Sequence, residues 1–345
     1  MDSLAQLAEF DSIIDVRAPG EFQDDHLPRA INLPVLSDDE RREVGTLYKQ
    51  VSPFAARKLG AAKVARNIAD HIESQLQQQP KSWRPLVYCW RGGQRSAAFA
   101  HVLREIGWDA HRLQGGYKSW RRHIVEQLEI LPSRHRFAVI TGPTGSGKSR
   151  LLQALAQHGA QTLHLEQLAV HKGSVLGASP TEAQPSQKSF ESQLFGALSA
   201  FDPQQTVYVE AESRKIGRLQ LPNALLHAIH TAPCLRIETS LSARIEFLLH
   251  DYADAIVRPH WLIERLGFLK GLQSNDTLDR WRSFVERGEF PTLVAELLTL
   301  HYDPLYRRSQ THHFDSLAHA ERLNIDRLTM EAFDRLARQI VAGSI

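Results

Sequence analysis

The sequence contains few cysteines. Its 345 residues include two, Cys89 and Cys234, which lie far apart, and no Cys-x2-Cys pair. Two thiols cannot supply a four-ligand zinc site by themselves, so we expect no structural zinc. Because disulfide-bonded secreted proteins use cysteine more densely, this composition favours a reducing, cytoplasmic environment.

Membrane and export signals are also lacking. No run of about 18 apolar residues occurs, so no membrane span is expected. The first residues, Met1-Asp2-Ser3-Leu4, do not combine a basic stretch with an apolar one, so no signal peptide is expected. The formal net charge of +2, from 41 basic and 39 acidic residues, neither requires nor excludes a nucleic acid partner. The chain length favours two domains.

A Gly-rich loop with a cysteine follows the apolar run Leu86-Val87-Tyr88. Such a loop, placed between a strand and a helix, directs backbone N–H groups at one anion. These dipoles and a neighbouring arginine should lower the pKa of Cys89 and make it a nucleophile. We therefore expect Cys89, Arg91 and Arg95 to be catalytic. The rest of the anion cup would be Trp90, Gly92, Gly93, Gln94 and Ser96.

A second phosphate-type loop follows the apolar residues 137–140. Residues 142–149 match the pattern G-x4-G-K-S without deviation. The pattern predicts that loop amides bind phosphates, that Lys148 neutralises them, and that the Ser149 hydroxyl is a candidate Mg²⁺ ligand. The other predicted phosphate-binding residues are Gly142, Thr144, Gly145, Ser146 and Gly147.

The ligand of this second loop is left open by the sequence. Hydrolytic P-loop enzymes usually end a later strand in Asp, whereas here residues 206–210 end in Glu210, followed by Glu212 and Arg214. Glu210 could hold metal-bound water, or the two glutamates could form a solvated strand end. Because no adenine-reading motif is visible, binding of a pyrophosphate ester without ATP turnover is a serious alternative.

Short apolar runs alternate with helical patterns in both halves, which predicts parallel α/β structure. We expect a domain over 1–130, a linker over 131–136, and a P-loop domain over 137–345 whose last part is mainly helical. Within these, we expect a strand at 162–166. Gly60 is expected inside a helix, either at a close approach of tRNA or of the other domain, or as an ordinary tolerated glycine.

Several motifs in the first 125 residues resemble the rhodanese family. They are Asp15-Val16-Arg17-x-Pro19-x-Glu21-Phe22, His26-Leu27-Pro28-x-Ala30-Ile31-Asn32-Leu33-Pro34, the Cys89 loop and Gly115-Gly116-Tyr117. The resemblance implies a cysteine that carries sulfur or selenium, with Asp15 and Arg17 in supporting positions. The loop is one residue longer than in most sulfurtransferases and has the Cys-x5-Arg length of phosphatases, which keeps a phosphatase alternative open for this domain.

The whole chain resembles the tRNA 2-selenouridine synthase family, in which a rhodanese domain precedes a P-loop domain. Further motifs agree, among them Leu165-Glu166-x-Leu168-Ala169-x-His171-Lys172-Gly173-Ser174, Glu210-x-Glu212-Ser213-Arg214 and Tyr302-Asp303-Pro304-x-Tyr306. The resemblance implies a cytoplasmic transferase acting on 2-thiouridine at the wobble position of tRNAs for Lys, Glu and Gln. Its co-substrates would be geranyl diphosphate and selenophosphate, with S-geranyl-2-thiouridine as the intermediate, 2-selenouridine as the product, and Mg²⁺ at the P-loop.

Two alternatives of other classes account for parts of the same pattern. One is a sulfurtransferase or phosphatase fused to an ATP-dependent small-molecule kinase, which explains both loops without tRNA. The other is a nucleotide-regulated tRNA-binding module with an inactive rhodanese domain. The presence of Cys89 argues against the second.

Overall fold

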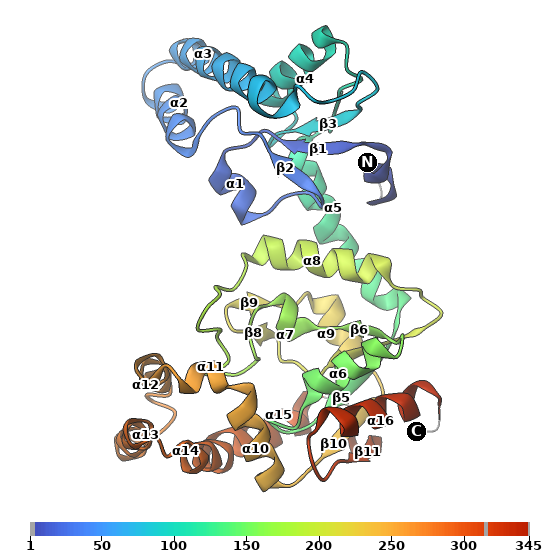
Figure 1. The fold of residues 1–345 in the computed structure, drawn as a ribbon, viewed down its shortest axis with the longest axis vertical. Helices are drawn as coiled ribbons and strands as arrows, with labels where there is room; N and C mark the ends of the chain where they lie inside the picture. The colour runs from blue at the N-terminus through green and yellow to red at the C-terminus, as the bar shows by residue number, and fades with distance from the viewer. Residues whose placement is uncertain (1–3, 314–316, 344–345) are drawn as a thin grey trace. The chain divides into compact units, whose positions relative to one another are not determined.

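Two parallel β-sheets organise the computed structural model, which describes residues 4–313 and 317–343 (Figure 1). The chain divides into an N-terminal unit, residues 1–127, and a C-terminal unit, residues 128–345.

The N-terminal unit has a four-stranded sheet in the order β2-β1-β3-β4, in which all neighbouring strands of the described residues are parallel. The strands are β1 (Ser12–Asp15), β2 (Ala30–Asn32), β3 (Pro85–Tyr88) and β4 (His111–Arg112). The helices are η1 (Leu4–Glu9), α1 (Pro19–Asp24), α2 (Asp38–Gln50), α3 (Pro53–His71), the π-helix η2 (Ile72–Leu76), α4 (Gln94–Ile106) and α5 (Gly116–Ile130), which continues past the end of the unit.

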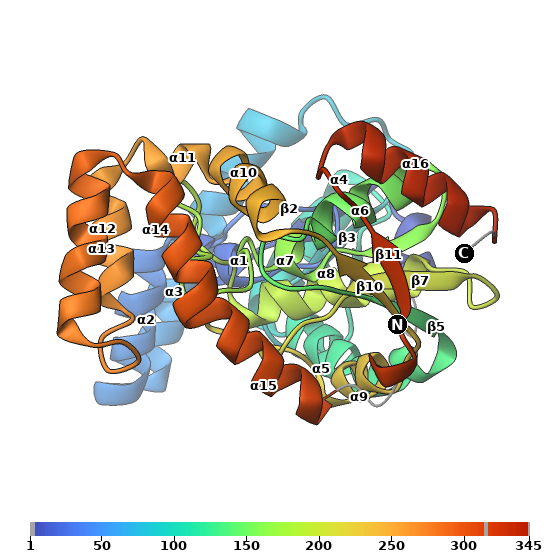
Figure 2. The same cartoon turned by 90° about the horizontal axis from the view of Figure 1, so that it is seen from below.

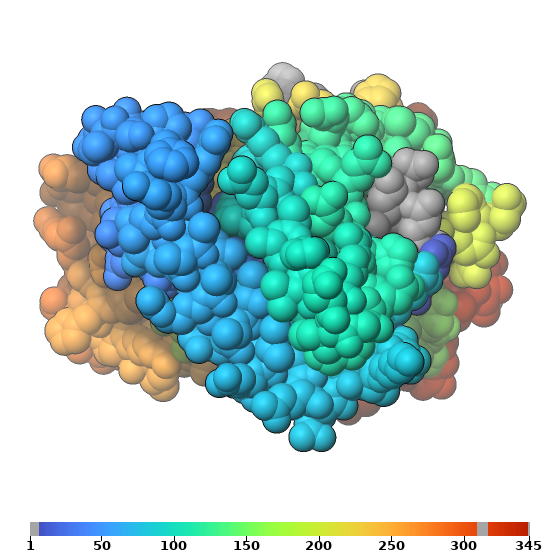
Figure 3. Space-filling view, turned by 90° about the horizontal axis from the view of Figure 1, so that it is seen from above, coloured from blue at the N-terminus to red at the C-terminus, as the bar shows by residue number. Residues whose placement is uncertain are grey.

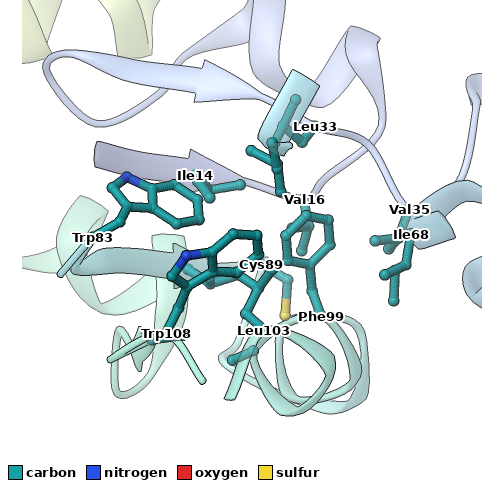
Figure 4. Packing of buried hydrophobic residues seen from close by; sticks show 14 residues of the cluster. Ile14, Val16, Leu33, Val35, Ile68, Trp83, Cys89, Phe99, Leu103 and Trp108 are labelled. Carbon is teal, nitrogen blue, oxygen red and sulfur yellow. The ribbon is translucent and has the colours of Figure 1, made fainter. Parts of the chain in front are cut away.

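The core of this unit lies around β3. All four residues of this strand are buried, as expected for a parallel strand that is covered on both faces. Phe99 and Leu103 of α4 are fully buried against it, in a cluster that also contains Cys89 (Figure 4). Strand and helix therefore fix the position of the short loop between them, which carries the cysteine.

Helices α2 and α3 pack closely, and Gly60 lies where they meet. Ser37 and Ser52 cap their N-termini by accepting hydrogen bonds from backbone N–H groups. Gly60 is buried, and a Cβ atom there would lie 3.3 Å from Cγ1 of Val44 on α2. The neighbour that Gly60 approaches is therefore a helix of the same unit, and the alternative of a contact with tRNA or the other domain stays a prediction. Figure 3 looks onto the surface of this unit, with α2 and α3 in blue.

The C-terminal unit has a five-stranded parallel sheet in the described residues, in the order β11-β10-β5-β7-β6. Its strands are β5 (Arg136–Thr141), β6 (Gln161–Leu163), β7 (Thr206–Glu210), β10 (Cys234–Glu238) and β11 (Glu321–Asn324). A small antiparallel pair, β8 (Lys215–Ile216) and β9 (Leu219–Gln220), lies outside this sheet. The helices in this part are α6 (Lys148–Gln157), α7 (Leu165–Leu168), α8 (Gln187–Ala200), α9 (Asn223–His230), η5 (Leu317–His319) and α16 (Met330–Val341).

A group of helices is inserted between β10 and β11. They are α10 (Leu241–Asp251), α11 (Ala253–Ile256), α12 (Pro259–Gly267), α13 (Asn275–Arg287), α14 (Phe290–Glu296), the π-helix η4 (Leu297–Tyr302) and α15 (Asp303–His313). Helices α12 to α14 lie together to one side of the sheet of this unit (Figures 1 and 2). They have their own core, in which Leu266, Leu269 and Trp281 are fully buried. The expected helical extension is therefore a packed subdomain.

Two local expectations differ from the structure. The segment expected as a linker contains the 3-10 helix η3 (Leu131–Arg134), with Leu131 and Pro132 buried, and β5 begins at Arg136. The strand expected at 162–166 ends at Leu163, because the N–H of Leu165 donates to the Glu210 carboxylate at 3.0 Å and begins α7. Across the described residues, we find no helix with the length and apolar character to cross a membrane.

Candidate active site

Cys89 follows the last residue of β3, and its sulfur is held by the next helix. Its side chain is 3% exposed, and Sγ lies 3.2 Å from the hydroxyl of Ser96. Burial acts to raise the pKa of this thiol, but the hydrogen bonds of Ser96 and the charge of Arg95 outweigh it, so the pKa is lowered. The environment therefore favours a thiolate.

The first residues of α5 make backbone hydrogen bonds to the Cys89 loop. The N–H of Tyr117 donates to the carbonyl of Cys89, and that of Lys118 to Trp90, both at 2.9 Å. Gly116 has φ +60°, and a Cβ atom there would lie 2.2 Å from the carbonyl oxygen of Cys89. Only glycine fits at this contact, which gives the Gly115-Gly116-Tyr117 motif a structural role.

Asp15 and Arg17 form a buried ion pair near the carboxyl end of β1. The Asp15 carboxylate accepts two hydrogen bonds from Arg17 Nε and one from Nη2, at 2.6–3.0 Å. The guanidinium carbon of Arg17 lies 3.9 Å from the centre of the Tyr117 ring, and Nη2 donates to the carbonyl of Asp25. Both side chains are fully buried, so this pair positions α5 and the strand end.

Arg95 pairs with a carboxylate that lies in one of the rhodanese motifs but was not predicted as its partner. Its Nη1 donates to Oε2 of Glu21 at 3.0 Å. Burial acts to raise the pKa of Glu21, but the charge and the hydrogen bond of Arg95 outweigh it, so the pKa is lowered. The remaining predicted cup residues lie on the loop surface: Arg91, Gly93 and Gln94 are exposed, and Trp90 and Gly92 are half-buried.

The second loop joins β5 to α6, and three of its glycines have positive φ. These angles are +154° at Gly142, +79° at Gly145 and +82° at Gly147. A Cβ atom on Gly147 would lie 2.3 Å from Cζ of Phe333, and one on Gly145 would lie 2.7 Å from Cδ1 of Leu248. The loop is therefore held in place by side chains of α16 and α10.

Lys148 and Ser149 begin α6. Lys148 Nζ donates to the carbonyl of Gly142 at 3.2 Å, and the Ser149 hydroxyl donates to Oε2 of Glu166 at 2.9 Å. Ser146 is fully buried, and its hydroxyl has no hydrogen-bond partner in the parts of the chain that the structure describes. The loop thus presents one ammonium and one carboxylate-bound hydroxyl at the helix N-terminus.

Glu210 and Glu212 are buried, so the alternative of a solvated strand end is wrong. Glu210 Oε2 accepts the Leu165 N–H, whereas Oε1 has no partner among the described residues. Burial, with the nearby charge of Glu166, raises the pKa of Glu210 to about 8. Burial and Glu166 also raise the pKa of Glu212 well above its ordinary value. In residues 4–313 and 317–343, no group of three or more acidic, His or Cys side chains is arranged to hold a metal ion.

The P-loop opens into a pocket of about 660 Å³. Predicted residues that line it are Thr144, Gly145, Gly147, Lys148, Ser149, Glu212 and Arg214. Apolar side chains form part of the wall, namely Leu226, Phe247, Leu248 and Leu305. The structure therefore brings the loop together with Glu212 and Arg214 beside an apolar surface.

Asp251 of the inserted helices lines the pocket, whereas Arg244 and Asp303 hold the P-loop from outside the lining, and spacing alone could not have identified these contacts. Asp251 of α10 accepts hydrogen bonds from Arg150 at 2.9 Å and Lys172 at 2.6 Å. Arg244 donates to the carbonyl of Thr144 at 2.8 Å and forms a bidentate pair with Asp303. Lys172 and Asp303 lie in motifs of the family, and this was the feature of the sequence that could have identified them.

Comparison with known proteins decides the family. The profile described as a rhodanese-like domain matches residues 1–123, and that described as a tRNA 2-selenouridine synthase AAA domain matches residues 135–273. A tRNA 2-selenouridine synthase of Shewanella denitrificans is 33% identical over 85% of this chain and 87% of its own length. This chain belongs to the tRNA 2-selenouridine synthase family.

Other members agree with this assignment. The tRNA 2-selenouridine synthase of Nitrosomonas eutropha is 36% identical over 88% of this chain and 90% of its own. That of Nitrosomonas europaea is 37% identical over 73% of this chain and 66% of its own. Membership of the tRNA 2-selenouridine synthase family confirms the expected fold class, a rhodanese-like α/β domain followed by a P-loop domain, and the expectation of an enzyme.

Proposed function

We propose that this chain converts 2-thiouridine at the wobble position of tRNAs for Lys, Glu and Gln into 2-selenouridine, with geranyl diphosphate and selenophosphate as co-substrates. Geranyl transfer forms a bond between the uridine sulfur and C1 of the geranyl group, while the C1–O bond to diphosphate breaks and the uridine loses a proton. Selenium then replaces sulfur at C2, and the geranylthio group departs more readily than a sulfide would.

The observation that carries the geranyl step is the P-loop pocket with its partly apolar wall. Loop N–H groups and the Lys148 ammonium would bind the diphosphate and stabilise its charge as it leaves. Leu248 and Phe247 supply surface for a hydrocarbon beside it. A nucleoside triphosphate would place its polar sugar and base against the same wall, which is a poorer chemical match.

The donor set of this pocket fits a Mg²⁺ ion. Ser149 and Glu166 supply a hydroxyl and a carboxylate that lie 2.9 Å apart. Mg²⁺ takes few protein ligands and completes its shell with water and phosphate oxygens, so two are sufficient. When bound, the ion would neutralise diphosphate charge.

For the selenium step, the proposal assigns selenophosphate to the Cys89 loop. Attack of the Cys89 thiolate on phosphorus forms an S–P bond, breaks the P–Se bond and releases hydrogen selenide, and no oxidant is needed. Water then regenerates the thiol and gives phosphate. Transfer of selenium onto sulfur as a perselenide would need a two-electron oxidant. The Cys-x5-Arg loop length, which suits a phosphate-sized group, supports attack at phosphorus.

Nucleoside mass spectrometry of tRNA tests the proposal. A strain that lacks this gene would be complemented with wild type, Cys89→Ser or Lys148→Ala. Wild type should restore 2-selenouridine, Cys89→Ser should accumulate S-geranyl-2-thiouridine, and Lys148→Ala should leave 2-thiouridine unmodified. Selenouridine at wild-type levels with Cys89→Ser would contradict the role of the thiol. Robust thiosulfate:cyanide transfer together with ATP hydrolysis by the purified protein would favour the sulfurtransferase–kinase alternative.

A further inference from the structure

A second, smaller cavity of about 70 Å³ adjoins the P-loop pocket. It lies among α10, α11, α12, α14 and η4, the inserted helices of the C-terminal unit. Most of its lining is apolar: Leu176, Leu248, Ala255, Ile256, Trp261, Leu262, Phe290, Leu293, Val294, Leu297 and Leu298. Such a cavity offers almost no hydrogen-bond partners to a polar ligand.

The two cavities share a wall at one place. Thr144 of the P-loop, Ser174, Leu248, Tyr252 and Tyr302 line both of them. The Tyr302 hydroxyl lies 3.3 Å from the Ser174 hydroxyl. A phosphate cradle and a hydrocarbon-lined space are thus neighbours, and they fit a ligand with an anionic head and an apolar tail.

We propose that this second cavity, the tail cavity, takes the distal isoprene unit of an allylic diphosphate and thereby selects ten-carbon chains. The proposal rests on the proposed function, since it needs the diphosphate to occupy the P-loop. The proximal isoprene unit, which carries the reacting carbon, stays in the larger pocket beside Leu248. The distal unit passes Tyr302 and enters the tail cavity.

The size of the cavity supports one unit and no more. A dry cavity of about 150 Å³ accommodates the six carbons of benzene, so a cavity of 70 Å³ holds one five-carbon unit only when its side chains move apart, and it has no room for a second unit. Its far wall includes Leu262, Leu293 and Leu297, which belong to the core of the inserted helices and are at most 8% exposed. A fifteen-carbon chain would have to displace this core, which is close-packed.

Binding measurements on the full chain test the tail cavity directly. Calorimetry would compare inorganic pyrophosphate with the unreactive thiolo analogues of dimethylallyl, geranyl and farnesyl diphosphates. In wild type, we expect the geranyl analogue to bind at least tenfold more tightly than the dimethylallyl analogue, because burying each CH₂ contributes about 0.8 kcal/mol. The farnesyl analogue should bind no more tightly than the geranyl one.

Two variants fill the cavity and one enlarges it. Ala255→Phe and Val294→Phe should lower geranyl affinity to the dimethylallyl level while leaving pyrophosphate and dimethylallyl affinity within twofold. Leu262→Ala should raise the affinity of the farnesyl analogue relative to the geranyl one. Thermal unfolding checks each variant, and Val294, which is half-buried, provides a filling variant if Ala255→Phe does not fold.

The outcomes separate the two proposals. If the geranyl analogue binds tightly and geranyl transfer proceeds, but both filling variants bind every analogue as wild type does, the tail cavity is wrong and the proposed function stands. If the filling variants lost the same affinity for all three analogues, the tail cavity would also be wrong, because it should contact the distal isoprene unit alone. If wild type binds the allylic analogues no better than pyrophosphate, both proposals fail.

Discussion

The guanidinium of Arg95 lies 3.0 Å from the Glu21 carboxylate, at the edge of the loop that holds Cys89. Glu21 therefore offsets part of the positive charge that lowers the pKa of the Cys89 thiol. Through this pair, a residue of α1 acts on the charge beside the thiol.

Glu21→Gln should lower the pKa of Cys89 further, by a few tenths of a pH unit, because Arg95 then keeps its full charge. The glutamine still accepts hydrogen bonds, so the local structure should persist. The rate of iodoacetamide alkylation as a function of pH measures this pKa, and the exposed Glu43→Gln serves as a control. An unchanged midpoint would mean that Glu21 does not tune the thiol.

Ser96→Ala should act in the opposite direction. It removes the hydroxyl that lies 3.2 Å from Cys89 Sγ. Because a hydrogen bond to a charged group contributes roughly 1.5 kcal/mol, the pKa of the thiol should rise by about one unit. The same alkylation profile measures it, with Ser74→Ala on the exposed face of the π-helix η2 as the matched control. A midpoint at or below that of wild type would exclude the hydroxyl as the stabilising group.

The two Gly-rich loops and the strands before them could be predicted from the sequence, because each is a contiguous pattern with a local physical meaning. The ion pairs around these loops could not be predicted in this way. Glu21 lies 74 positions from Arg95, and Arg244 lies 59 positions from Asp303, so only the folded chain brings these charges together. The same reason explains Gly60, whose neighbour Val44 belongs to another helix.

Lys148→Ala should weaken binding of inorganic pyrophosphate by roughly tenfold or more, since a charge-assisted hydrogen bond contributes about 1.5–3 kcal/mol. Calorimetry of the purified chain measures the affinity, and Lys270→Ala, at an exposed position outside the pocket lining, is the control. Equal affinity in wild type and Lys148→Ala would remove this lysine from the phosphate site.

Glu210 should make the stability depend on pH. Its pKa is raised from 4.5 to about 8, so the folded chain keeps a proton that the unfolded chain releases. Its contribution to the free energy of unfolding is full below about pH 4.5 and is lost as the pH rises towards 8, at up to about 1.4 kcal/mol per pH unit. In urea denaturation, Glu210→Gln should flatten the dependence of the free energy of unfolding on pH. The substitution Glu246→Gln, at an exposed position, should leave that dependence unchanged. A slope that stays the same in Glu210→Gln would disprove the assignment.

Gly116→Ala should destabilise the N-terminal unit much more than Gly107→Ala. Both positions have positive φ, so both substitutions carry a backbone cost of about 1–2 kcal/mol. At Gly107 the added methyl group has space, whereas at Gly116 it meets the Cys89 carbonyl at 2.2 Å. Thermal unfolding gives the difference, and slower alkylation of Cys89 should accompany it. Equal effects of the two substitutions would show that the Cys89 loop can move away from the added methyl group without a loss of stability.

The contact of Phe333 with Gly147 has a consequence for where the catalytic unit ends. The matched AAA profile stops at residue 273, yet the ring that backs the P-loop glycine comes from α16, some 60 positions later. A polypeptide shortened at that profile boundary would keep every residue of the proposed phosphate-binding loop and lose the side chain that packs behind Gly147. Anyone who seeks a minimal phosphate-binding fragment therefore has to retain the C-terminal helix.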